Sequence, residues 1–384
     1  MNKHLILSTT FLIFALRCVA ASPPRTVDLT SPDGTKLKAT YFSADKPGPG
    51  VMLLHQCNRD RKMWDDLAPR LAAEGLNVLA LDYRGYGESE GATYYKLPAE
   101  EGQKQVREKW PQDIDTAYQY LISQPGVNKN VVGAGGASCG VNHSIQLAKR
   151  HPEVKSLVLL SGGTDRTGRM FLRRSSNLPI FAAGADDDGD VVSVLQWILS
   201  TSPDPANRLQ HYTAGGHGIE MFTPHPELTG LITSWFETTL LKSPGKAPAN
   251  PNRTSLDSSI LATMDEPGGL AKAAEMLAVA RKNNPSASLF PQGPVNMMGY
   301  GYLQDGKIKD AIEAFQLNVT AYPDSPNAYD SLSEAQAADG QTDLAIQNAE
   351  KALRLLESDT KDSEDRRKDI RDSAEQRLKK LQGK

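Results

Sequence analysis

Three short segments, in one fixed order, constrain this chain more than any other feature of its sequence. The first is a Gly-Ala-Ser-Cys-Gly run at residues 136–140, the second is a run of carboxylates at residues 186–190, and the third is a Gly-Gly-His-Gly run at residues 215–218. Each follows an apolar run of strand length. One kind of catalytic triad has its residues in this order along the chain. The nucleophilic serine comes first, in a turn between a strand and a helix, and the orienting acid and the basic histidine follow.

The segments lie within residues 27–241, where short β-rich runs alternate with helical stretches. Buried runs that alternate with helices predict a doubly wound, mostly parallel sheet in an α/β fold, and the order of the three segments predicts its α/β-hydrolase form. The segment between Ser161 and Pro179 is too short for a helical lid, so the domain is predicted to be lid-less. The predicted strands are 37–42, 51–54, 77–81, 130–134, 156–160, 180–183 and 209–212. The predicted helices are 61–74, 113–123, 141–151, 192–199 and 227–240.

Ser138 is the predicted nucleophile. A nucleophile in a sharp turn between a strand and a helix, called a nucleophile elbow, needs small neighbours. The serine backbone is strained there, and the next helix packs tightly on the strand. Gly136 and Gly140 provide that space. Cys139 as the nucleophile would require a glycine at position 137, where Ala137 stands, so the spacing favours the serine.

The acid is predicted within residues 186–190. Asp187, three residues after Gly184, is the preferred candidate, and Asp186 is the alternative. The run faintly resembles a calcium loop, but Gly189 is misplaced for one and Trp197 stands where the twelfth-position glutamate would be. We therefore predict no metal site and no cofactor.

His217 is the predicted general base, because flanking glycines allow its loop to reach across the strand ends to the serine. Four other histidines lack such a setting and are predicted to be packing or surface residues. They are His143, His151, His211 and His225.

Residues 51–89 resemble the dienelactone-hydrolase-like branch of the α/β hydrolases. The resemblance is carried by the runs His-Gln-Cys-Asn at 55–58, Leu-Ala-Ala-Glu-Gly at 71–75 and Asp-Tyr-Arg-Gly-Tyr-Gly at 82–87, and it extends over most of residues 27–241. It implies acyl-transfer chemistry, with the N–H of Cys57 joining that of Cys139 in an oxyanion hole. The chain departs from the family in having Gln56 where a glycine is common, and a serine where dienelactone hydrolases use cysteine.

The two predicted oxyanion donors, Cys57 and Cys139, are the only cysteines outside residues 1–21, a segment with the features of a removable secretory signal. Two N–H groups that converge on one oxygen must be close, which brings their Cα atoms into disulfide range. We therefore expect Cys57 and Cys139 either to form a disulfide or to line the acyl pocket as free thiols; two unrelated cysteines are the remaining alternative.

A Pro- and Gly-containing linker at residues 242–253 precedes a region with a different pattern. Residues 254–384 contain a period of 34 residues, shown by Gly306 and Gly340 and by Ala311 and Ala345, and they resemble tetratricopeptide (TPR) repeats. An unrelated antiparallel helical bundle is the alternative. A TPR-like, all-α domain implies a protein partner or a packing role, with the charged segment 361–382 solvating its open end.

The first 21 residues have the features of a secretory signal, with Lys3 and His4 before an apolar stretch and a small-residue cleavage site that ends at Ala21. The apolar stretch is shorter than the ~20 residues of a membrane span. A secreted or periplasmic protein without a membrane span in its mature part is therefore expected. The net charge is −3, and the sequence has no basic stripe that would bind nucleic acid.

These observations predict an exported serine hydrolase that cleaves carboxylic esters on a small-molecule or peptide acyl substrate. A serine peptidase or amidase of the same fold is one alternative, and a non-catalytic TPR adaptor on a hydrolase scaffold is another. Because every predicted strand and site residue precedes the linker, the sequence also predicts that residues 251–384 can be deleted without loss of folding.

Overall fold

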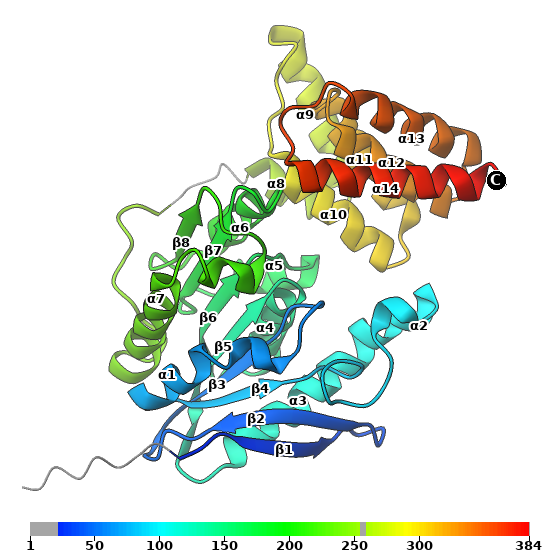
Figure 1. Cartoon of the computed structure of the whole chain (residues 1–384). Coiled ribbons are helices and arrows are strands. Elements are labelled where there is room, and N and C mark those ends of the chain that lie inside the picture. Colours follow the sequence, from blue (N-terminus) through cyan, green and yellow to red (C-terminus); the bar gives the residue numbers. More distant parts are fainter. Residues whose placement is uncertain (1–21, 254–258, 384) are drawn as a thin grey trace, which may run out of the picture.

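The computed structural model describes residues 22–253 and 259–383, so the predicted signal at residues 1–21 lies outside the described residues. An eight-stranded sheet carries helices on both faces, and further helices follow at the C-terminal end (Figure 1). The strand order is β1-β2-β4-β3-β5-β6-β7-β8. The β1–β2 and β2–β4 pairs are antiparallel, and the other pairs are parallel. The strands are β1 (Arg25–Thr30), β2 (Lys36–Phe42), β3 (Gly48–Leu54), β4 (Asn77–Leu81), β5 (Val127–Ala137), β6 (Val154–Leu160), β7 (Ile180–Ala185) and β8 (Arg208–Tyr212).

The central strands are apolar along their whole length because the sheet is covered on both faces. Every residue of β3, β4 and β7 is buried, as expected for parallel strands between two helical layers. Successive side chains alternate between the faces: Met52 and Leu54 belong to one core cluster, whereas Val51 and Leu53 belong to the other. The first cluster includes residues of α3 (Trp110–Ser123), α4 (Cys139–Arg150) and α6 (Val191–Thr201). The second includes residues of α1 (Leu67–Glu74) and α7 (Glu227–Phe236).

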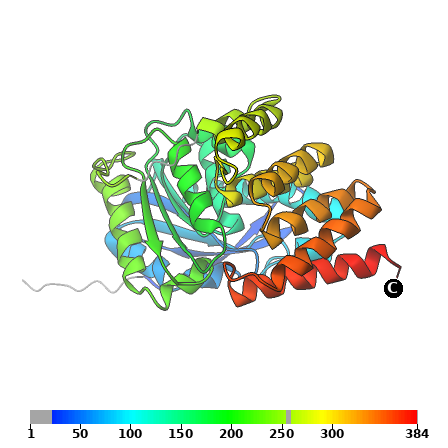
Figure 2. The ribbon, with the colours of Figure 1, turned by 90° about the horizontal axis from the view of Figure 1, so that it is seen from above.

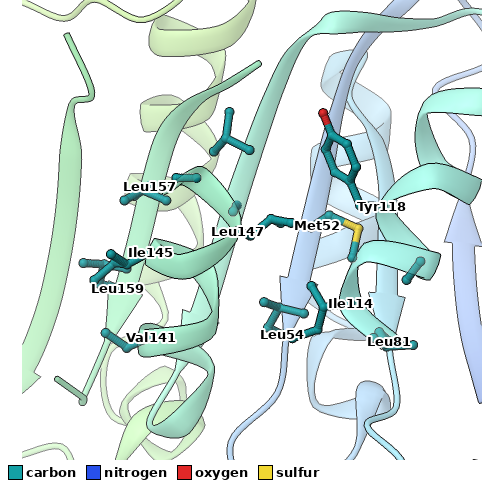
Figure 3. Packing of buried hydrophobic residues seen from close by; sticks show 14 of the residues in the cluster. Met52, Leu54, Leu81, Ile114, Tyr118, Val141, Ile145, Leu147, Leu157 and Leu159 are labelled. Carbon is teal, nitrogen blue, oxygen red and sulfur yellow. The ribbon is translucent and has the colours of Figure 1, made fainter. Parts of the chain in front are cut away.

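Figure 3 shows the first cluster between β3, β6, α3 and α4, with Met52 and Leu54 near Ile114 and Tyr118. Fully burying a side chain of this size contributes roughly 1.5–3 kcal/mol. This layer holds β5 and α4, and therefore the turn between them, in a fixed position.

The predicted lid-less α/β arrangement is confirmed, and the seven predicted strands correspond to β2–β8. Between β6 and β7 the only helix is α5 (Arg166–Leu172). The edge strand β1 was not predicted, because its alternating exposed and buried residues are too few to give a strong signal. Between β4 and α3 the chain forms a short 3-10 turn, α2 (Ala99–Lys104) and a π-helical turn (Gln105–Lys109).

The C-terminal helices form pairs that repeat along the chain. The pair α10–α11 begins at residues 292 and 308, and α12–α13 begins 34 residues later, at 326 and 342. Gly306 and Gly340 have φ values of 72° and 76° between the helices of each pair, where a side chain would be strained. The 34-residue period is therefore a property of the fold, and the TPR-like assignment stays a prediction. The helices are α8 (Ser259–Met264), α9 (Gly269–Asn283), α10 (Gln292–Gln304), α11 (Ile308–Ala321), α12 (Pro326–Ala338), α13 (Thr342–Leu356) and α14 (Glu364–Leu381).

A buried ion pair joins these helices to the α/β part, and Figure 2 shows them, coloured yellow to red, along one side of it. Arg169 Nη2 lies 2.6 Å from Asp265 Oδ1, and the two side chains are 3% and 1% exposed. The Arg169 guanidinium also lies 4.1 Å from the ring centroid of Trp197 in α6. Trp197 shares a core cluster with Ile260 and Leu261 of α8. Deleting residues 251–384 would uncover Trp197 and leave Arg169 without Asp265, so this interface argues against the predicted independence of the α/β part.

Candidate active site

Ser138 occupies the turn between β5 and α4 with a strained backbone. Its φ and ψ are 53° and −119°, a conformation that is uncommon for any residue but glycine. A Cβ at Gly136 would overlap the carbonyl of Gly140, and one at Gly140 would overlap the carbonyl of Leu54. The glycines on both sides of the serine are therefore required by close backbone packing, as the sequence predicted.

His217 lies beside this elbow. Its neighbour Gly218 has a φ of 62°, and a Cβ there would lie 3.5 Å from Cβ of Ala137, the residue before the serine. The imidazole is hydrogen-bonded through Nδ1, 2.8 and 2.9 Å from the two carboxylate oxygens of Asp188. In the described part of the chain it makes no hydrogen bond to Ser138 Oγ, and such bonds are often long before substrate binds. Burial lowers the pKa of His217, but the hydrogen bond and charge of Asp188 outweigh it and leave the pKa above its ordinary value.

The predicted pairing of Asp187 with the histidine is wrong, because Asp188 occupies that position. The physical reason is the end of β7, which runs to Ala185 and continues its ladder through Asp186 N, 3.0 Å from Tyr212 O. The following turn is closed by Asp188 N, 3.2 Å from Ala185 O. The third residue after the strand thus faces the histidine, with a side chain that is 15% exposed.

The other carboxylates of residues 186–190 have separate partners. Asp186 Oδ1 lies 2.7 Å from His211 Nε2. Asp187 accepts from the N–H groups of Gly215 and Gly216 at 3.0 and 3.1 Å, which holds the histidine loop against the acid turn. Burial raises the pKa of Asp190, which lies at the start of α6. The four carboxylates therefore diverge, and only Asp188 is paired with the predicted base.

Cys57 and Cys139 form a disulfide, with Cα atoms 5.9 Å apart. The bonded alternative of the sequence analysis is therefore confirmed, and free thiols are not. Cys139 is the first residue of α4, so its N–H has no acceptor within that helix. The disulfide holds the loop after β3 against the N-terminus of α4, where an anion is also favoured by the helix dipole.

Gln56 connects this loop to the histidine loop. Its Oε1 accepts from Ile219 N at 3.0 Å, and its Nε2 donates to Asn58 Oδ1 at 2.7 Å. In the sequence, only the departure from glycine at this position marked Gln56 as unusual. Glu220, which was also missed, accepts from His217 N at 3.1 Å.

A cavity of about 510 Å³ opens beside the loop that follows β3. Asn58 borders it next to Cys57, and Ile219 borders it close to His217. Its other lining residues are Arg59, Asp60, Met63, Tyr86, Gly87 and Tyr95. The space is large enough for a small-molecule ligand group.

The other histidines occupy packing or surface positions, as predicted. His143 lies in an aromatic cluster, 5.3 Å from the ring of Trp110, and burial lowers its pKa to about 4. His225 stacks on Tyr212 with ring centroids 3.7 Å apart. Within the residues that the structure describes, no three metal-ligating side chains gather, and no helix is long and apolar enough to cross a membrane.

Fold and site together define an α/β hydrolase fold with a strained serine elbow. Comparison with known families gives the same assignment for part of the chain: residues 45–182 match the family described as Hydrolase_4, serine aminopeptidase S33.

Curated relatives also match part of the chain. An uncharacterized protein of Mycobacterium tuberculosis is 32% identical over 139 residues, which are 36% of this chain and 45% of that protein. The thiohydrolase AneE of Aspergillus aculeatus is 30% identical over 113 residues, 29% of this chain and 33% of that protein. The matches thus span less than half of the length of these relatives.

Solved structures with a similar arrangement include an esterase of Pyrococcus furiosus and a dienelactone hydrolase of Anabaena variabilis. The esterase is 19% identical, with a TM-score of 0.45 over 56% of this chain and 91% of its own. The dienelactone hydrolase is 19% identical, with a TM-score of 0.44 over 57% of this chain and 98% of its own.

Proposed function

We propose that the protein is a serine hydrolase that cleaves carboxylic esters through an acyl-enzyme intermediate. The observation that carries the proposal is the partly buried Asp188–His217 pair beside the strained elbow of Ser138. A base that is oriented by a carboxylate and lies next to a serine is the arrangement that activates a hydroxyl as a nucleophile.

In the proposed reaction, Ser138 Oγ attacks the ester carbonyl carbon while His217 Nε2 takes the hydroxyl proton. The carbonyl oxygen becomes an oxyanion that accepts hydrogen bonds from the N–H groups of Cys57 and Cys139. The tetrahedral intermediate collapses, the C–O bond to the alcohol breaks, and His217 gives its proton to the departing alcohol. The histidine then deprotonates a water that attacks the acyl-serine, which releases the carboxylic acid and restores the serine. None of these steps needs a metal or cofactor.

Labelling with a fluorophosphonate probe tests the nucleophile. We expect the wild type to be labelled and to hydrolyse p-nitrophenyl acetate, and Ser138→Ala to lose both, because losing a triad nucleophile typically costs on the order of 10⁴-fold or more in turnover. Ser144→Ala is the matched control, since Ser144 Oγ is buried in α4 without a hydrogen-bond partner. Labelling that persists in Ser138→Ala would reject the assignment.

A peptidase or amidase is the second candidate, favoured by the serine aminopeptidase family that residues 45–182 match. The same nucleophile and base serve both reactions, and only the leaving group differs. Comparing p-nitrophenyl esters with aminoacyl-p-nitroanilides separates them. A wild type inert to the probe and to both substrate classes would instead favour the non-catalytic TPR adaptor.

We also propose that the protein works in a secreted or periplasmic location, with its C-terminal helices as a TPR-like module open to a protein partner. A disulfide is favoured by an oxidising compartment, which agrees with the signal features of residues 1–21. Cell fractionation combined with N-terminal sequencing tests this proposal, and a mature chain that starts at Ser22 is the expected result.

A further inference from the structure

Helix α10 contacts the α/β part at three places along its length. Near its start, Gly293 packs so closely that a Cβ there would overlap Cβ of Asp190 and lie 2.7 Å from Ser193 Oγ. In its middle, Met297 lies against Gly163. At its end, the carbonyl of Gln304 accepts a hydrogen bond from Arg107. A helix of this length extends about 20 Å, so α10 bridges from the acid turn to the segment before α3 (Figure 1).

The middle contact brings α10 close to the nucleophile. Gly162 and Gly163 are the second and third residues after the end of β6. A Cβ at Gly162 would overlap the carbonyl oxygen of Ser138, and one at Gly163 would overlap Sδ and Cε of Met297. Because consecutive Cα atoms are only about 3.8 Å apart, Met297 is separated from the serine backbone by two glycines without side chains.

The face of α10 that carries these contacts also has free space. Gly293, Met297, Gly301 and Gln304 are three or four positions apart and so share one side of the helix. The opposite side is filled: a Cβ at Gly299 would overlap the ring of Phe315 in α11. At Gly301, in contrast, a Cβ would meet no atom within 4 Å.

The surroundings of Gly163 are apolar. A Cβ at this position would meet Cγ1 of Val194 at 3.0 Å besides Met297, and Met297 is one of the partly buried hydrophobic side chains that pack on the core cluster to which Val194 belongs. The leaving alcohol must lie on the side of His217, which protonates it, and Ile219, two residues after His217, borders the cavity of about 510 Å³. The acyl group must leave the carbonyl carbon in another direction, and on the side of α10 the backbone of Ser138 is covered by Gly162 and Gly163, against which Met297 lies.

We propose that α10 forms the distal wall of the acyl-binding site and that Met297 and Gly301 are its specificity-determining residues, for esters with an apolar acyl chain. The proposal rests on the proposed esterase function and assigns part of the substrate site to the C-terminal helices. Met297 limits the depth of the site next to the serine, and the space at Gly301 receives the end of a longer chain.

The test is the ratio of kcat/KM for p-nitrophenyl octanoate to that for p-nitrophenyl acetate. One extra or missing methylene group in an apolar pocket changes kcat/KM by about 10–200-fold. We expect Met297→Ala to raise the ratio by about tenfold and Gly301→Leu to lower it by about tenfold. Met276→Ala, on the exposed side of α9, is the control for the first variant. Gly230→Leu is the control for the second, because a Cβ at Gly230 in α7 also meets no atom within 4 Å. Circular dichroism and the melting temperature check that all four variants fold.

The outcomes separate this proposal from the proposed function. A wild type without ester turnover or fluorophosphonate labelling overturns the function and this proposal with it. Ester turnover with an octanoate-to-acetate ratio that neither Met297→Ala nor Gly301→Leu changes overturns only the role of α10. A response to the length of the alcohol rather than of the acyl chain also overturns the acyl assignment.

Discussion

The two sides of Ser138 are held by different kinds of interaction. On the oxyanion side, a covalent bond joins Cys57 to Cys139 across 82 positions of the chain. On the acid side, the histidine loop is held by hydrogen bonds: Asp187 accepts from the N–H groups of Gly215 and Gly216, and Asp188 pairs with Nδ1 of His217. On the oxyanion side, the disulfide limits local shifts of the backbone. On the acid side, the orientation of the imidazole depends on which residue of one tight turn faces His217.

This difference predicts where single substitutions act most strongly. On the acid side, a change of one carboxylate alters the chemistry directly, because the imidazole loses its orientation and its ionic partner. On the oxyanion side, loss of the disulfide leaves both backbone N–H groups in the chain and removes only the constraint on their positions. We therefore expect substitutions of the acid to reduce activity more than loss of the disulfide does.

The largest effect is expected from Asp188→Asn. An amide cannot fix the tautomer of His217 as a carboxylate does, so kcat for p-nitrophenyl acetate should fall by on the order of 10³–10⁴-fold. Asp187→Asn is the matched control. It keeps an acceptor oxygen for the N–H groups of Gly215 and Gly216, and we expect a loss of less than about tenfold. Steady-state kinetics decide between them, and a greater loss from Asp187→Asn would return the catalytic role to that residue.

The variant Asp265→Ala tests how firmly the C-terminal helices are attached to the α/β part. These helices also contact the acid turn, through Asp190. Breaking a buried pair on one side leaves an uncompensated charge, which costs about 3–5 kcal/mol. We expect the free energy of unfolding of Asp265→Ala to fall by that amount because Arg169 stays buried. Urea denaturation measures it.

The control for this prediction is the exposed pair Lys242–Glu237, with side chains 63% and 33% exposed. Glu237→Ala should change the free energy of unfolding by less than about 1 kcal/mol. If Asp265→Ala were no more destabilising than Glu237→Ala, the C-terminal helices would be a weakly attached module, as the sequence predicted.

Removing the disulfide should have a smaller effect. A bond that closes a loop of this length stabilises by about 2–4 kcal/mol, chiefly by restricting the unfolded chain. We expect Cys57→Ser to lose that stability and to lower kcat by roughly tenfold, far less than Asp188→Asn. Dithiothreitol should reproduce both effects in the wild type and leave Cys57→Ser unchanged. A variant with full stability and full activity would show that the bond does not brace the site.

The contrast between the two sides also explains what the sequence could predict. The proximity of Cys57 and Cys139 was predicted from the two oxyanion donors that the family resemblance implies, and it does not depend on the register of either segment. The choice among the carboxylates of residues 186–190 depends on whether β7 ends at Gly184 or at Ala185. A shift of one residue in that end changed the identity of the acid, and boundaries of this kind are set by pairing with β8 rather than by the local sequence.

The same limit applies to the C-terminal helices. Their 34-residue period is visible in the sequence because each pair repeats the same small residues at the same places. Their attachment to the α/β part depends instead on contacts between distant residues, such as Arg169 with Asp265 and Gly163 with Met297. No local pattern marks these residues, since an arginine in a short helix and a methionine in a longer one are also common on surfaces.

The smallest effect, and the finest test of the acid side, is the pH dependence of kcat/KM. His217 must be neutral to act as a base, so activity should rise as the pH increases through its pKa, which lies above the ordinary value. In Asp188→Asn the hydrogen-bonded charge that raises this pKa is removed while burial, which lowers it, remains. The acidic limb of the residual activity should therefore move to lower pH.

In the wild type, a raised pKa in the folded protein also means that His217 stabilises the fold fully below about pH 6.5, and that this contribution is lost as the pH rises through the pKa of the folded state. Asp187→Asn should leave the limb where it is, because that carboxylate faces backbone N–H groups and not the imidazole. An acidic limb that moves in Asp187→Asn and stays fixed in Asp188→Asn would reverse the assignment of the two residues.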